Sequence, residues 1–95
     1  MIEIRRIGGE DPLEFEVTIR DATGESSHAV TLSYQDYERL TAGRHTPEQC
    51  IDAAFRFLLD REPKEAILRR FDIRVIATYF PEFEQALPRY LADSE

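Results

Sequence analysis

The first third of the chain alternates between apolar and polar residues. Over residues 13–20 every second residue is apolar, a period of two that is typical of a β-strand with one buried face. A turn-forming segment, 21–25, follows, in which Gly24 tolerates a positive φ angle. The alternation then resumes over residues 27–34, with the inward positions His28, Val30, Leu32 and Tyr34. The pattern predicts an antiparallel hairpin with one face in water.

A weaker apolar alternation precedes the hairpin. Ile2, Ile4 and Ile7 indicate a shorter strand before the break at Gly8–Pro12, where the glycines let the chain turn. We therefore expect a sheet of two to three antiparallel strands within residues 1–34.

The rest of the chain has helical spacing. A short helix is expected from Ser33 or Tyr34 to Ala42, with Gly43 as its left-handed cap. The sequence Thr46-Pro47-Glu48-Gln49 is a capping box with proline at the first helical position. The apolar stripe that follows includes Ile51, Ala54, Phe55 and Leu58, and its extra apolar neighbours predict a central helix.

Prolines divide the last third into further expected helices. Pro63 is expected to begin one whose inward residues are Ile67, Leu68 and Phe71, and Asp72 to cap another. Pro81 is expected to open the last helix, and Pro88 to kink or end it. The fold predicted for residues 1–95 is a single α+β domain: the small antiparallel sheet, then a layer of four to five helices over residues 35–92.

Composition narrows the class of protein. The 95 residues suffice for one domain, and the apolar and charged fractions, 42% and 33%, are those of a globular chain. The net charge of −7 repels nucleic acid and anionic lipid at long range. One cysteine, Cys50, forms no internal disulfide, and we find no signal peptide or membrane-length apolar run. These features favour the cytoplasm.

Residues suited to catalysis are sparse. His28 lies on the inward face of a strand, which favours a hydrogen-bonded structural role, and His45 lies in a loop without a second metal ligand nearby. Glu14 and Glu16 share a strand face and are expected to be solvated. We expect no catalytic residues, no metal and no cofactor.

The arginines of the helical half suggest a nucleic-acid alternative. Residues 56–74 hold six basic residues against four acidic ones, a net charge of only +2. Glu65 and Arg69 have the i, i+4 order of a helical ion pair. Binding of DNA or RNA would depend mainly on Arg69, Arg70 and Arg74.

Seven of the ten aromatic residues lie between Phe55 and Tyr90, and two roles stay open for them. Most are expected to form the core. Alternatively, Tyr79, Phe83 and Tyr90 rim an apolar patch for a partner protein or a second copy. The edge of the hairpin is a second candidate docking site, through addition of a strand.

The segment from Phe55 to Phe83, FRFLLDREPKEAILRRFDIRVIATYFPEF, resembles a group of small bacterial conserved hypothetical proteins. The resemblance implies a bacterial cytosolic protein and brings no activity or site residue with it. The leading hypothesis is therefore a non-catalytic protein–protein interaction domain, with self-association as one form of it.

Overall fold

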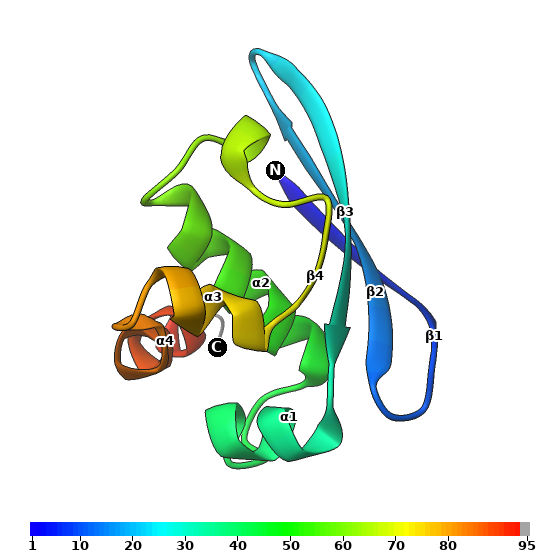
Figure 1. Cartoon of the computed structure of the whole chain (residues 1–95), viewed down its shortest axis with the longest axis vertical. Helices are drawn as coiled ribbons and strands as arrows, with labels where there is room; N and C mark the ends of the chain where they lie inside the picture. The colour runs from blue at the N-terminus through cyan, green and yellow to red at the C-terminus, as the bar shows by residue number, and fades with distance from the viewer. Residues whose placement is uncertain (94–95) are drawn as a thin grey trace.

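The computed structural model describes residues 1–93 of the chain, which form a four-stranded mixed sheet and four α-helices (Figure 1). The strands are β1 (Ile2–Gly8), β2 (Leu13–Asp21), β3 (Gly24–Leu32) and β4 (Arg70–Asp72). The α-helices are α1 (Tyr34–Thr41), α2 (Pro47–Leu59), α3 (Arg74–Tyr79) and α4 (Phe83–Ala92), and a 3₁₀ turn, η1, spans Lys64–Ala66. The predicted α+β class is confirmed.

The antiparallel part of the sheet follows the alternation read from the sequence. β2 and β3 pair in unbroken register from Leu13–Leu32 to Asp21–Gly24, and their alternate apolar residues are buried. β1 pairs antiparallel with β2, so the first strand does join the sheet. β1 covers the β2 edge of the hairpin, and β4 covers the β3 edge over Ala29–Thr31. The hairpin edge expected as a docking site is thus occupied within the chain over these residues.

The expected number of strands, two to three, and their purely antiparallel pairing are both wrong. A fourth strand, β4, pairs parallel with β3 over three residues, from Ala29–Arg70 to Thr31–Asp72. It lies inside the stretch predicted to be purely helical. Two backbone bonds bracket it: the Ala29 N–H donates to the Arg69 carbonyl at 2.8 Å and the Ile73 N–H to the Thr31 carbonyl at 3.0 Å.

The helix predicted from Pro63 does not form. Only the single turn η1 follows the proline, and the backbone at Ile67 is extended, with φ −78° and ψ 132°. Ile67 and Phe71 are buried as expected, whereas Leu68, expected to face inward, is 47% exposed. Extended backbone allows Phe71 to reach the core and its peptide groups to bond β3, and this non-local pairing outweighs local helical preference.

The first two helices keep their predicted boundary signals. The Ser33 hydroxyl caps α1 by accepting from the Asp36 N–H at 3.0 Å. At its other end the C-cap residue is Ala42, with φ 54°, and the following Gly43 also has a positive φ, 71°. α2 has both halves of the predicted capping box: the Thr46 side chain accepts from the Gln49 N–H, and the Gln49 side chain accepts from the Thr46 N–H.

Proline and aspartate act differently in the last two helices. Asp72 is not the N-cap residue of α3, which is Ile73, but its carboxylate accepts from the Arg74 N–H at 3.0 Å. α4 begins two residues after Pro81 and continues through Pro88 to Ala92, so Pro88 does not end it.

All helices lie on one face of the sheet, and the other face is open (Figure 1). α2 packs between the sheet and α4, as its wide apolar stripe predicted, and Phe55 and Phe57 on it are fully buried. Within residues 1–93 no helix has the length and apolarity needed to cross a bilayer.

Candidate interaction cleft

An apolar cleft opens on the helical side of the molecule, between the end of α2, the segment 66–71 and α3. Its volume is about 140 Å³. Most of its lining is apolar, and Glu62 is its one charged residue among those the structure describes. The apolar lining includes Leu58, Ile67, Leu68, Phe71, Ile76 and Tyr79.

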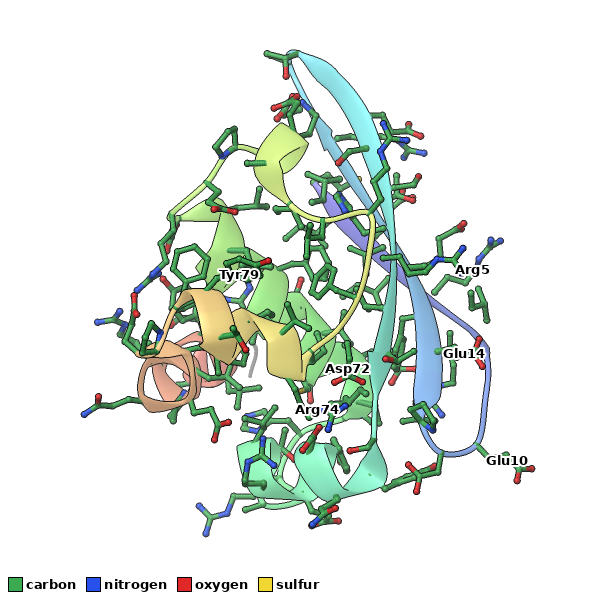
Figure 2. All side chains as sticks on the ribbon, in the orientation of Figure 1. Arg5, Glu10, Glu14, Asp72, Arg74 and Tyr79 are labelled. Carbon is green, nitrogen blue, oxygen red and sulfur yellow. The ribbon has the colours of Figure 1, made fainter. Side chains whose placement is uncertain are left out.

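Two large apolar side chains at this cleft remain in water. Leu68 is 47% exposed, and Tyr79 at the end of α3 is 65% exposed. Figure 2 places Tyr79 on the helical side, across the sheet from Arg5 and Glu14. Ile67 and Phe71 on either side of Leu68 are buried in the core, whereas Leu68 stays at the surface of the cleft.

A buried histidine fixes the backbone at Leu68. The His28 side chain is 2% exposed, and its Nδ1 lies 2.7 Å from the Leu68 carbonyl oxygen. Because a carbonyl only accepts, Nδ1 carries the proton and donates it, and Nε2 meets the Ser26 hydroxyl at 2.9 Å. The ring also packs against Phe55, with centroids 5.6 Å apart. The structural role predicted for His28 is confirmed.

A buried lysine anchors η1, which leads into the cleft. Only 2% of the Lys64 side chain is exposed, and its ammonium group donates to Asp21 at 2.8 Å, to Glu65 at 2.6 Å and to the Thr23 hydroxyl. The hydrogen bond that Lys64 donates to Asp21 holds the pKa of Asp21 well below its ordinary value and raises the pKa of Lys64. The β2–β3 turn and η1 are thereby tied together.

The three residues predicted to rim a partner site do not share a surface. Tyr79 is exposed, but Phe83 and Tyr90 are only 1% and 8% exposed. Both pack edge-on against Phe57, with ring centroids 5.1 and 5.8 Å away. Phe83 and Tyr90 thus belong to the core, the alternative that the sequence had left open for them, and Tyr79 alone of the three lines the cleft.

The three candidate nucleic-acid arginines are exposed but dispersed. Arg74 lies 3.1 Å from Asp72, and Figure 2 shows these two side chains together. Arg70 begins β4, whereas Arg69 lies in the bend that precedes the strand. Arg70 lines a hollow of about 250 Å³ on the open sheet face that also contains Glu14 and Asp72. Carboxylates thus accompany two of the three arginines.

The described part of the chain offers no reactive thiol and no metal-binding cluster. Cys50 is fully buried, and burial raises the pKa of its thiol to about 12, which suppresses the reactive thiolate. Residues 1–93 contain no cluster of three histidine, cysteine, aspartate or glutamate side chains that would hold a metal ion. Glu16, on the open sheet face beside Glu14, pairs with Arg5 at 2.6 Å.

The glycine pair before β2 has the turning role expected from the sequence. Gly9 has φ +77°, and a Cβ atom there would lie 2.4 Å from the Pro12 carbonyl oxygen. Any other residue would therefore strain the connection between β1 and β2.

Of the cleft residues, only Tyr79 was predicted to lie at a partner surface. Leu58, Ile67, Leu68, Phe71, Ile76 and Phe80 were assigned to the apolar faces of helices, and Val75 had no assigned role. Ile67, Leu68 and Phe71 have the i, i+1, i+4 spacing of a helix, so no local signal marked the extended segment.

Comparisons of the chain with protein-family models, curated proteins and solved structures find no match.

Proposed function

We propose that this chain is a non-catalytic protein–protein interaction domain that receives an apolar side chain of a partner protein in the cleft beside Tyr79. The observation that carries the proposal is the exposure of Leu68 and Tyr79 at an apolar cavity. Exposed large apolar groups grouped around a concave site are typical of interaction surfaces. The bacterial origin and cytoplasmic location expected from the sequence stay predictions.

The size of the cleft favours a side chain over a small-molecule substrate. Sites for drug-sized ligands usually measure about 300–1,000 Å³, more than the 140 Å³ available here. An apolar cavity of about 150 Å³ holds one benzene molecule. The cleft thus has room for one aromatic or branched aliphatic side chain.

Charge defines the partner segment further. Glu62 is the charged residue of the cleft, and the whole chain carries a net charge of −7. A segment with an apolar anchor and a neighbouring lysine or arginine matches both features, and opposite charge speeds its association.

A peptide selection tests this proposal. Random peptides are selected on the wild-type domain, and the affinity of each is then measured for Tyr79→Ala and for the control Tyr34→Ala. Tyr34 is also exposed, at 47%, but lies at the start of α1, away from the cleft. We expect an apolar anchor flanked by a basic residue, and a loss of about thirtyfold in affinity for Tyr79→Ala only, the effect of removing an interface aromatic worth about 2 kcal/mol.

Two results would contradict the proposal: selected peptides that bind both variants equally, or no selected peptide at all. Binding of a fluorescent oligonucleotide at low salt, lost in Arg69→Ala, Arg70→Ala and Arg74→Ala, would instead favour the nucleic-acid alternative.

A further inference from the structure

The outer edge of β1 is backbone without a neighbouring strand. The Met1 amino group and carbonyl bond Arg20 at 2.7 and 2.9 Å. Because bonding alternates along an antiparallel pair, the N–H and C=O groups of Ile2, Ile4 and Arg6 point away from β2. No backbone group elsewhere in residues 1–93 bonds them. This edge therefore offers a regular row of donors and acceptors.

Two opposite charges follow this edge on the open face of the sheet. Glu3 and Arg5 are two residues apart, and their side chains are 51% and 73% exposed. Within the chain, Glu3 pairs with Arg20 at 2.8 Å and Arg5 with Glu16 at 2.6 Å. Figure 2 shows Arg5 on the side of the sheet away from the helices. Both charges remain accessible to a further strand.

We propose that a second copy of this chain adds to this edge, with the two β1 strands antiparallel about a two-fold axis through Ile4. In this register Glu3 of each copy lies opposite Arg5 of the other. At least two of Ile2, Ile4 and Arg6 pair with each other only when the two-fold axis lies at Glu3, Ile4 or Arg5, which leaves two other registers. One sets Glu3 against Glu3 and the other Arg5 against Arg5. Only the axis at Ile4 places opposite charges together at both positions.

The resulting contact joins two four-stranded sheets into one. Pairing of Ile2, Ile4 and Arg6 with their partners supplies about six backbone hydrogen bonds. A row of alternating charge then crosses the interface, from Glu16 through Arg5 to Glu3 of the other copy. The contact is short, because a bulge between Arg6 and Gly8 ends the regular strand, and each copy carries a charge of −7. Association is therefore weak and strengthened by moderate salt, which screens the net repulsion.

Sedimentation of two charge variants, alone and mixed, tests the register. Glu3→Arg leaves two positive charges on the edge and Arg5→Glu two negative ones, so each alone faces like charge. We expect each variant to self-associate at least about tenfold more weakly than the wild type. In an equal mixture every charge again faces its opposite, and a heterodimer at least as stable as the wild-type dimer should form.

Matched controls separate the register from net charge. Glu10→Arg and Arg44→Glu change the total charge equally but lie on exposed loops away from the edge, and should associate as the wild type does. Circular dichroism checks folding. If either edge variant unfolds, Glu3→Gln and Arg5→Gln replace them, with an expected weakening of about threefold and no rescue on mixing.

The proposal is overturned if the wild type stays monomeric up to about 1 mM, if the edge variants associate like their controls, or if the mixture forms no heterodimer. The cleft proposed above uses different residues. Tyr79→Ala should leave self-association unchanged, so failure of one proposal is distinguishable from failure of the other.

Discussion

The two edge strands of the sheet differ in length, direction and cover. β1 is seven residues long, antiparallel to its neighbour, and half-buried at best. β4 is three residues long, parallel to its neighbour, and centred on the buried Phe71. β1 thus has backbone N–H and C=O groups along its outer edge that are unpaired within residues 1–93, whereas β4 is held against the sheet mainly by side-chain contacts. The longer edge strand, β1, is therefore not the one that is held by buried contacts.

Three contacts from two elements, α2 and β3, anchor β4 and the segment before it. Phe71 packs against Phe55 of α2, with ring centroids 5.9 Å apart. His28 of β3 bonds the segment before the strand, and the Thr31 hydroxyl donates to Asp72 at 2.6 Å. Among the described residues, the ion pairs of β1 with Arg20, Glu16 and Glu48 are all exposed to water. The edges should therefore respond differently to substitution.

Truncating one apolar residue in each edge should give the largest contrast. Phe71→Ala is expected to lower the free energy of unfolding by about 3 kcal/mol, because a buried ring is lost and a cavity remains. Ile4→Ala, at a partly buried position of β1, should cost about 1 kcal/mol. Urea unfolding measures both values, and equal losses would remove the proposed distinction.

Removing the histidine link should have the next largest effect. His28→Ala deletes the donor to the Leu68 carbonyl and the contact with Phe55, and we expect a loss of about 2 kcal/mol. The Ile73 amide, which bonds Thr31, should exchange its hydrogen faster. Ser26→Ala, the control, keeps the bond to Leu68 and should cost less than about 1 kcal/mol. Unchanged exchange at Ile73 would mean that His28 does not hold β4.

Acid should weaken the lysine anchor. The pKa values of Asp21 and Glu65 are held below their ordinary values first by hydrogen bonds from Lys64. Lowered carboxyl pKa values contribute stability that is present above about pH 4 and is lost as the pH falls through the folded-state values. The free energy of unfolding should therefore fall more between pH 6 and pH 3 in the wild type than in Lys64→Met. Parallel pH profiles would contradict this anchor.

The exposed ion pair of β1 should give the smallest effect. Arg5→Gln removes the contact with Glu16, and because both side chains are in water we expect less than about 0.5 kcal/mol. A double-mutant cycle with Glu16→Gln, measured at a concentration too low for self-association, gives the pair energy. A coupling above about 1 kcal/mol would show that β1 is anchored more firmly than its exposure indicates.

The cleft lies beside the anchored edge, and this explains why it was hard to foresee. Tyr79 was named in advance for its aromatic ring and its position after an apolar stripe. Leu68 was placed inward because a helix was predicted to begin at Pro63. Once β4 forms, Ile67 and Phe71 face the core and Leu68 faces water, so a single non-local pairing reassigns the residue.

The sequence alone determined the elements whose signals are local. The alternation over residues 13–20 specified β2, the capping box at Thr46 specified the start of α2, and the wide stripe after it specified a central helix. Each signal depends on residues within about four positions of one another, where the period of a strand or helix and the reach of a capping side chain are fixed by backbone geometry.

The formation of β4, the position of the cleft and the burial of Phe83 and Tyr90 became apparent from the tertiary structure alone. Thr31 and Asp72 are separated by 41 positions, and nothing in either neighbourhood encodes their contact. Ten residues of α4 with an apolar stripe predict a buried face, but only the packing of Phe57 against it decided which aromatic rings were covered. Burial and parallel pairing depend on surfaces that meet only after the chain has folded.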